Sequence, residues 1–327
     1  MDDGATLSVS GAYQLEGRLA DAETVRLLKL ATTASVATAV VLIVVKLVAF
    51  VLTDSVSILS TLIDSLLDAA ASLINLIAVR HALVPADREH RFGHGKAEPL
   101  AAMGQAAFIT GSAIFLVIEA APRFFTPHAI SHSEVGIGVM IFSIVATLGL
   151  VTLQRHVIRR TGSLAISADQ LHYTGDLLVN GAVILALILA VELGWTLADP
   201  IFGIGIAAYI LYNAWQIASG AFDMLMDREL PEEERARIRG VIQAHEGVLG
   251  IHDLRTRASG PQIFIQCHVE LDPGQSLLQA HAISDAVEDD LRQAFPGAEV
   301  IIHQDPYPAD RETAARAPEA SGPALDA

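Results

Sequence analysis

Two apolar stretches of the sequence each carry a pair of ionisable side chains four positions apart. Asp64 and Asp68 lie in SILSTLIDSLLDAAASLINLIAV, and His172 and Asp176 lie in SADQLHYTGDLLVNGAVILALILAV. A spacing of four places both members of a pair on one helix face. A carboxylate in the middle of a membrane-spanning helix costs about 2.5–3.5 kcal/mol, so such groups usually face a cavity and mark an ion pathway. If the two faces meet, this membrane cluster of one imidazole and three carboxylates could surround a divalent cation, zinc best of all.

The alternative for Asp64 and Asp68 is a short re-entrant or water-exposed segment in which they only bond to neighbouring groups. The insertion cost of buried carboxylates favours the ligand interpretation.

A second group, the loop cluster, consists of Asp87, His90 and His94 in DREHRFGHGKAE. Their short spacing lets a flexible loop fold onto one cation. A solvated loop that positions lipid head groups or the adjacent helix explains the same residues equally well. Because such a loop is not preorganised, any metal site there is expected to be weak.

A third group, the sheet cluster, lies in the C-terminal part of the chain. In IFIQCHVEL the alternation puts Cys267 on one face of a strand and His268 on the other. Other ligand-type residues could reach the same region if their strands neighbour this one, and Asp305 could bridge two metals. Unrelated surface histidines are the alternative. The cluster comprises His252, His268, His281, His303 and Asp305.

Composition indicates a polytopic membrane protein with a soluble appendage. The chain has 327 residues, of which 52% are hydrophobic, and its mean hydropathy is +0.45. The apolar residues are gathered into long blocks. The formal net charge of −16 argues against nucleic-acid binding and suits a surface that handles cations. The single cysteine, Cys267, excludes an intramolecular disulfide and a cysteine-rich metal cluster.

Six blocks are each long enough to span a bilayer of roughly 30 Å. Basic residues precede the first block and gather in the loops after the second and the fourth, so the positive-inside rule predicts that both termini are cytoplasmic. No cleaved signal peptide is expected at the N-terminus. The predicted spans are Leu27–Val51, Val56–Leu83, Pro99–Phe124, Val135–Ile158, Leu164–Leu193 and Ala198–Met224.

From Leu230 onward the pattern is that of a soluble domain. Pro231 and three glutamates open a helix, two strands follow around a Ser-Gly-Pro turn, and a helix and a last strand complete an α-β-β-α-β order. This order predicts a small α+β domain of ferredoxin-like or metallochaperone-like type. The predicted organisation is a cytoplasmic N-terminal segment (1–25), a six-helix transmembrane domain (26–228), a cytoplasmic domain (229–308) and a disordered tail (309–327).

Several motifs, in this order and with these separations, resemble those of the bacterial cation diffusion facilitator family, in particular its zinc and iron exporter branch. The similarity extends from about Arg26 to Pro308. The motifs are SVSILSTLIDSLLD, FGHGKAE, the pair His172 and Asp176, LMDRELP, HDLRTR and IIHQDP.

The resemblance implies a role for each group of residues. The membrane cluster would be the transport site, the loop cluster a second metal site, and the sheet cluster a binuclear site that supports dimerisation. Lys96 and Asp227 would form a charge interlock between two protomers near the membrane surface. Judged from the residues alone, most charges at such positions are simply solvated.

The function implied is proton-coupled efflux of divalent cations by a homodimer in the bacterial inner membrane, with zinc favoured and cadmium and iron(II) as further substrates. Protonating His172 would eject the ion, because imidazolium cannot bind zinc. A membrane-anchored metal sensor without net transport is the alternative, although a sensor does not need charged groups inside its spans. An enzyme is disfavoured, since the sequence contains neither a His-Glu-x-x-His motif nor a nucleophile elbow.

Overall fold

The computed structural model describes residues 21–53, 56–124, 134–193 and 197–307. The chain divides into two compact units, one ending at Met226 and the other beginning at Asp227. Most of the predicted N-terminal segment and all of the predicted disordered tail lie outside the described residues.

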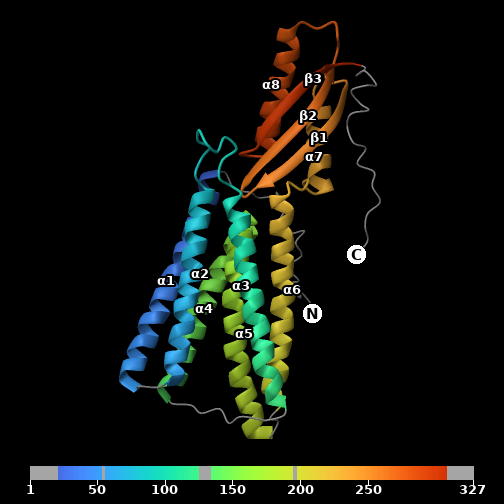
Figure 1. Cartoon of the computed structure of the whole chain (residues 1–327). Coiled ribbons are helices and arrows are strands. Elements are labelled where there is room, and N and C mark those ends of the chain that lie inside the picture. Colours follow the sequence, from blue (N-terminus) through green and yellow to red (C-terminus); the bar gives the residue numbers. More distant parts are fainter. Residues whose placement is uncertain (1–20, 54–55, 125–133, 194–196, 308–327) are drawn as a thin grey trace. The chain divides into compact units, whose positions relative to one another are not determined.

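The first unit is a membrane domain built from helices that follow the apolar blocks of the sequence (Figure 1). Within the described residues, five helices are long and apolar enough to cross a membrane, and α5, which carries the second pair of the membrane cluster, completes a six-helix domain. The helices are α1 (Asp21–Thr53), α2 (Val56–Ala82), α3 (Ala97–Ala120), α4 (Glu134–Thr161), α5 (Leu164–Leu193) and α6 (Ala198–Leu225).

The third helix ends earlier than its apolar block does. The α-helix stops at Ala120, and a 3-10 turn, η2 (Ala121–Phe124), takes over. Pro122 has no N–H to donate to the preceding turn, so regular α-helical bonding cannot continue through it.

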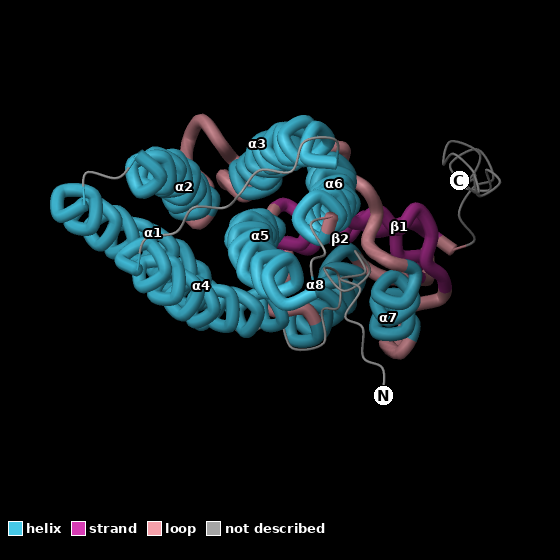
Figure 2. Tube along the Cα trace, turned by 90° about the horizontal axis from the view of Figure 1, so that it is seen from below, coloured by secondary structure: helices cyan, strands magenta, loops and turns pink. Residues whose placement is uncertain are grey.

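α5 is the central helix of this unit, because it contacts each of the other five membrane helices. Figure 2, which views the bundle along its helices, shows α5 between α4 on one side and α3 and α6 on the other. α1 packs against α2 and α4, and α3 packs against α6 and α2. Side chains on α5 therefore reach neighbours on every side.

One face of α1 is apolar and exposed. Val40, Val44, Val48 and Leu52 recur every fourth position and are 51%, 53%, 53% and 77% exposed. This spacing forms a stripe along one side of the helix. A stripe of this kind is stable in contact with lipid chains, as expected for a membrane-spanning helix.

The interior of the bundle contains a polar junction around Asp169 of α5, which is completely buried. Its Oδ2 accepts hydrogen bonds from Ser35 Oγ of α1 at 2.5 Å and Gln154 Nε2 of α4 at 2.7 Å. Its Oδ1 accepts from Gln105 Nε2 of α3 at 3.2 Å and Ser72 Oγ of α2 at 3.3 Å. One carboxylate thus joins α5 to four other helices, and its hydrogen bonds compensate for its burial.

The second unit has the α-β-β-α-β order that the sequence predicts (Figure 1). Strand β1 pairs antiparallel with β2, and β2 pairs parallel with β3. Ser276 caps α8 by a capping box with Gln279. The elements are α7 (Glu232–Gln243), β1 (Gly250–Ser259), β2 (Gln262–Leu271), α8 (Leu277–Ala294) and β3 (Glu299–Pro306).

One face of this sheet belongs to the core. Ile265, Cys267 and Val269 of β2 are at most 2% exposed, and Val287 and Leu291 of α8 are completely buried. The alternation predicted for β2 is therefore confirmed on its apolar side. The residues between them point to the other face, which carries the sheet cluster.

Candidate functional site

Three residues of the membrane cluster converge between α2 and α5. The Nε2 atom of His172 lies 2.9 Å from Asp68 Oδ1 and 3.8 Å from Asp176 Oδ2. One ligand atom from each of the three residues lies within 4.8 Å of the others. The imidazole is nearly buried, with 9% of the side chain exposed, whereas 21% of Asp68 and 41% of Asp176 are exposed. The donors therefore meet at a point that an ion can reach.

This convergence follows from helix geometry. His172 and Asp176 are four positions apart on α5 and share a face, as the spacing predicts. Between them, Gly175 lets α5 approach α6, because a Cβ there would lie only 3.0 Å from Ile210 Cδ1. Small residues allow such close packing of membrane helices.

A cavity of about 660 Å³ opens beside these donors. Asp64 also lines it, although in the described residues its carboxylate is not part of the close ligand group. The cavity is thus acidic at one wall and mostly apolar elsewhere, with Ser112 as a further polar residue. Its apolar wall includes Phe108, Leu116, Leu171, Val179 and Ile210.

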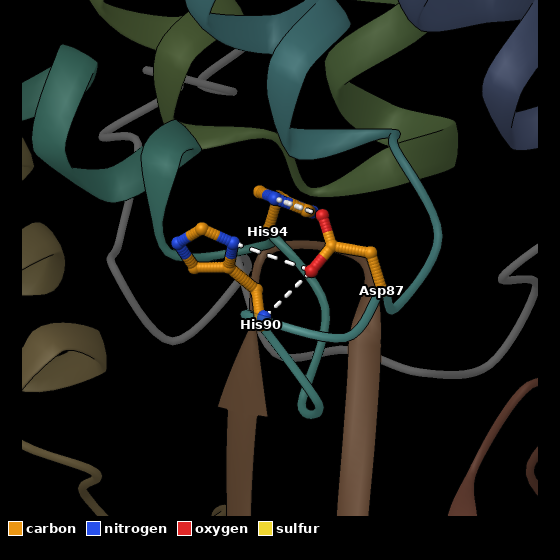
Figure 3. A group of neighbouring side chains, drawn as sticks. All are labelled: Asp87, His90 and His94. Atoms are coloured by element: carbon orange, nitrogen blue, oxygen red, sulfur yellow. Dashed lines mark hydrogen bonds and ion pairs between the residues drawn. The ribbon is translucent and has the colours of Figure 1, made fainter.

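The loop cluster also converges, as Figure 3 shows. One oxygen of Asp87, Oδ1, lies 3.4 Å from His90 Nδ1, and the other, Oδ2, lies 3.5 Å from His94 Nε2. Asp87 and His90 are about half exposed, whereas only 5% of the His94 side chain is exposed. Two imidazoles and one carboxylate are a donor set that suits zinc.

The loop is better organised than the sequence indicates. The backbone N–H groups of His90 and Glu89 donate to Asp87 Oδ1 at 2.6 and 2.9 Å. The bond from His90 is the main reason that the pKa of the Asp87 carboxyl lies below its ordinary value. His94 Nδ1 lies 3.3 Å from the Val84 carbonyl oxygen, which orients the ring so that Nε2 faces Asp87. The loop therefore has local hydrogen bonds that the sequence did not indicate, and the strength of any metal site there stays a prediction.

The sheet cluster is brought together by strand register. His252 of β1 is directly opposite His268 of β2, and His268 is in turn aligned with His303 of β3. Asp305 of β3 lies among them: its Oδ2 is 2.8 Å from His268 Nδ1 and 3.2 Å from His252 Nε2, and its Oδ1 is 3.2 Å from His303 Nε2. The two oxygens of Asp305 thus contact three imidazoles. Only 12% of its side chain is exposed.

His281 is the predicted member that the structure does not bring into this group. It lies on α8, where its Nδ1 is 3.3 Å from Asp285 Oδ1, and 63% of its side chain is exposed. The helix that carries it packs on the apolar side of the sheet through Val287 and Leu291. A role for His281 in metal binding stays a prediction from the resemblance.

Two further acidic residues, which the sequence analysis did not assign to the sheet cluster, lie beside its histidines. Glu270 Oε1 lies 3.1 Å from His252 Nδ1, and Asp253 Oδ2 lies 3.7 Å from His268 Nε2. Asp253 has a φ of +46° and sits where the β1–β2 register shifts, as in a β-bulge. The bulge lets the consecutive residues His252 and Asp253 approach neighbouring imidazoles. The glutamate is found by continuing the β2 alternation one step past His268, whereas the bulge has no signal in the sequence.

Lys96 and Asp227 each have a contact inside their own unit. Lys96 Nζ donates to the Leu225 carbonyl oxygen at 3.3 Å. Asp227 Oδ1 accepts from Arg257 Nη1 at 3.1 Å. The predicted interlock between protomers stays a prediction.

Both units match models of a known family. Residues 32–226 match the cation efflux transmembrane domain, and residues 230–307 match the cytoplasmic domain of cation efflux proteins. The chain belongs to the cation efflux family. The resemblance to bacterial cation diffusion facilitators is thereby confirmed, and membership makes this multi-span membrane protein a cation transporter rather than a catalyst.

Curated relatives of this cation efflux protein are similar along most of their length. The cation-efflux pump FieF of Pectobacterium atrosepticum is 50% identical over 284 residues, which are 87% of this chain and 94% of the relative. FieF of Klebsiella pneumoniae subsp. pneumoniae is 49% identical over 281 residues, 86% of this chain and 93% of the relative. Among solved structures, a chain of CzrB is 39% identical, covers 24% of this chain and 96% of its own length, and has a TM-score of 0.23.

Among the charged residues of the membrane helices to which the sequence analysis assigned no role are Asp169 of α5 and Lys46 of α1. The cost of a charge inside a membrane span, which singled out the membrane cluster, applies equally to them. That cost alone would have identified Asp169 and Lys46, because it does not require a second ionisable residue four positions away.

Proposed function

We propose that this cation efflux protein exports divalent metal ions, zinc above all, from the cytoplasm in exchange for protons. The observation that carries the proposal is the close group of Asp68, His172 and Asp176 beside a cavity in the membrane domain. One imidazole nitrogen with carboxylate oxygens forms a site suited to zinc and acceptable to cadmium and iron(II). The name cation-efflux pump, which the FieF relatives carry, supports the direction of transport.

Metal and proton compete for the same atoms in this proposal. The Nε2 atom of His172 can bind either a metal ion or a proton, and imidazolium has no free lone pair for zinc. A proton arriving from outside therefore weakens the site. Net export follows if the helices that carry the cluster expose it alternately to the two sides, because the inward proton gradient then favours release outside.

The remaining predictions belong to the same proposal. Asp64 joins the membrane cluster as the fourth ligand when an ion is bound. The loop cluster and the sheet cluster bind cytoplasmic metal ions, and the sheet cluster supports a homodimer whose protomers are held together by Lys96 and Asp227. The basic loops support cytoplasmic termini and an inner-membrane location.

Flux in proteoliposomes tests the proposal. The purified protein is reconstituted with a zinc-sensitive dye and a pH-sensitive dye inside the vesicles, and zinc, cadmium, iron(II) and manganese are added outside in turn. We expect zinc entry with proton exit. A protonophore should remove the internal pH change but not the zinc entry, because zinc still moves down its own concentration gradient. Metal binding without flux would favour the sensor, and flux without any proton movement would contradict the exchange.

A further inference from the structure

Lys46 of α1 lies within the apolar run VVLIVVKLVAF, and its side chain is half-buried. Its Nζ donates to the Thr61 carbonyl oxygen at 3.1 Å and to Ser65 Oγ at 2.6 Å. Both acceptors are on α2, so the lysine reaches across from one helix to the next. An ionisable residue inside a membrane span is costly and marks a functional position whose partner should be identified.

The hydrogen-bond partners of this ammonium flank Asp64, one carboxylate of the membrane cluster. Thr61 and Ser65 lie on either side of Asp64 in the sequence, and Ser65 is only 2% exposed. The hydrogen bonds therefore hold the ammonium against the turn of α2 that contains Asp64, one turn before Asp68. An ammonium held at Ser65, next to Asp64 in the sequence, is attracted to the neighbouring carboxylates.

The net charge around the cavity changes when Lys46, which does not itself line it, is counted with the cluster. Three ionised carboxylates and a neutral imidazole carry three negative charges, and the ammonium leaves two. A bound dication then makes the group neutral, whereas a monovalent ion leaves one negative charge and a trivalent ion adds one positive charge. Uncompensated charge is unfavourable away from bulk water, so the neutral combination is preferred.

We propose that Lys46 is a specificity-determining residue that fixes the charge of the transport cavity at two negative units. By repelling the bound ion, it also keeps metal affinity low enough for release. This inference rests on the proposed function, because it requires the membrane cluster to be the site that binds the transported ion. Lys46 itself does not ligate the metal.

Cadmium binding by the full-length protein in nanodiscs tests the inference. The variants are Lys46→Met and Lys46→Gln, which remove the charge, and Lys46→Arg, which keeps it as the matched control. Each variant is measured alone and combined with His172→Ala, so that binding at the membrane cluster is the part that His172→Ala removes. La³⁺ then competes against bound Cd²⁺ as a probe of preferred charge, and efflux is measured in liposomes.

We expect both neutral variants to bind Cd²⁺ at the membrane cluster at least about tenfold more tightly than the unmodified protein, because a repulsive charge has been removed. They should also export Cd²⁺ more slowly, and a lower concentration of La³⁺ should displace the bound Cd²⁺. Lys46→Arg should resemble the unmodified protein. Equal affinities in all variants, or a loss of affinity in the neutral ones, would overturn the inference and leave Lys46 as a structural link between α1 and α2. If His172→Ala removes no binding from the unmodified protein, it is the proposed function that fails.

Discussion

Two carboxylates on the same helix, Asp169 and Asp176, have opposite surroundings. Asp169 is completely buried and accepts hydrogen bonds from donors on four other helices. Asp176, about two helical turns further along α5, is 41% exposed, lines a cavity and has the His172 imidazole at 3.8 Å. A carboxylate whose lone pairs are filled by fixed donors holds a structure together, whereas one that faces a cavity keeps its lone pairs for an ion.

The largest effect is expected at His172, in the proposed transport site. His172→Ala should abolish or severely weaken zinc-for-proton exchange, because it removes the nitrogen ligand and the group at which metal and proton compete. Zinc flux in proteoliposomes measures the change, with reconstitution efficiency and elution volume as controls for folding. Undiminished flux in the variant would contradict the assignment of the transport site.

Replacing Asp169, at the centre of the polar junction, should lower the free energy of unfolding. Asp169→Ala leaves several buried donors without an acceptor, and each such donor costs about 1–3 kcal/mol, so a loss of about 3 kcal/mol or more is expected. Thermal unfolding in detergent without added metal measures it. Asp169→Asn is the matched control, because it keeps one oxygen acceptor and should lose less. If both variants unfold like the unmodified protein, Asp169 is not a structural junction.

Asp176 should show the reverse behaviour. Without metal, Asp176→Ala should change the free energy of unfolding by no more than about 1 kcal/mol and can raise it, because one of several neighbouring negative charges is removed. Added zinc should then stabilise the variant less than the unmodified protein. The same unfolding measurement with and without zinc decides this. A large loss of stability without metal would mean that Asp176, like Asp169, holds the helices together.

The smallest effect is expected in β2, where the consecutive residues Cys267 and His268 face opposite sides of the sheet. Cys267 is the buried member of this pair, as Asp169 is on α5. Cys267 faces the core and is 2% exposed, and its burial raises the pKa of the thiol to about 12. The reactive thiolate is therefore scarce at neutral pH and increases only as the pH approaches that value. We expect iodoacetamide to leave folded protein unmodified at pH 7.5 and to label it fully after denaturation, as mass spectrometry would show. Rapid labelling of folded protein would mean that this face of the sheet is open.

The helices were predictable because each apolar block is long and ends at polar residues. The predicted α5 span, Leu164–Leu193, has the bounds that the structure gives. The pairing of His172 with Asp176 followed from a spacing of four on one helix, and the face carrying Cys267 followed from alternation. These features depend on local periodicity alone.

Other features depend on which elements become neighbours, and sequence spacing does not contain that information. The contact between Lys46 and Ser65 needs the packing of α1 on α2, and the alignment of His252 with His268 needs a register that includes a bulge at Asp253. The separation of His281 from the sheet histidines likewise depends on how α8 packs in the described structure. Periodicity therefore predicted the ligand pairs, and tertiary packing determined what surrounds them.

The position of Asp169 along α5 has a mechanical consequence. Because hydrogen bonds join Asp169 to four neighbouring helices, α5 is held at this residue and would tilt about it. Asp176 is then at the end of a lever about 10 Å long, and a tilt of about 10° displaces its carboxylate by roughly 2 Å. A small rotation of α5 is thus large enough to move Asp176 away from Asp68, the carboxylate opposite it in the proposed transport site.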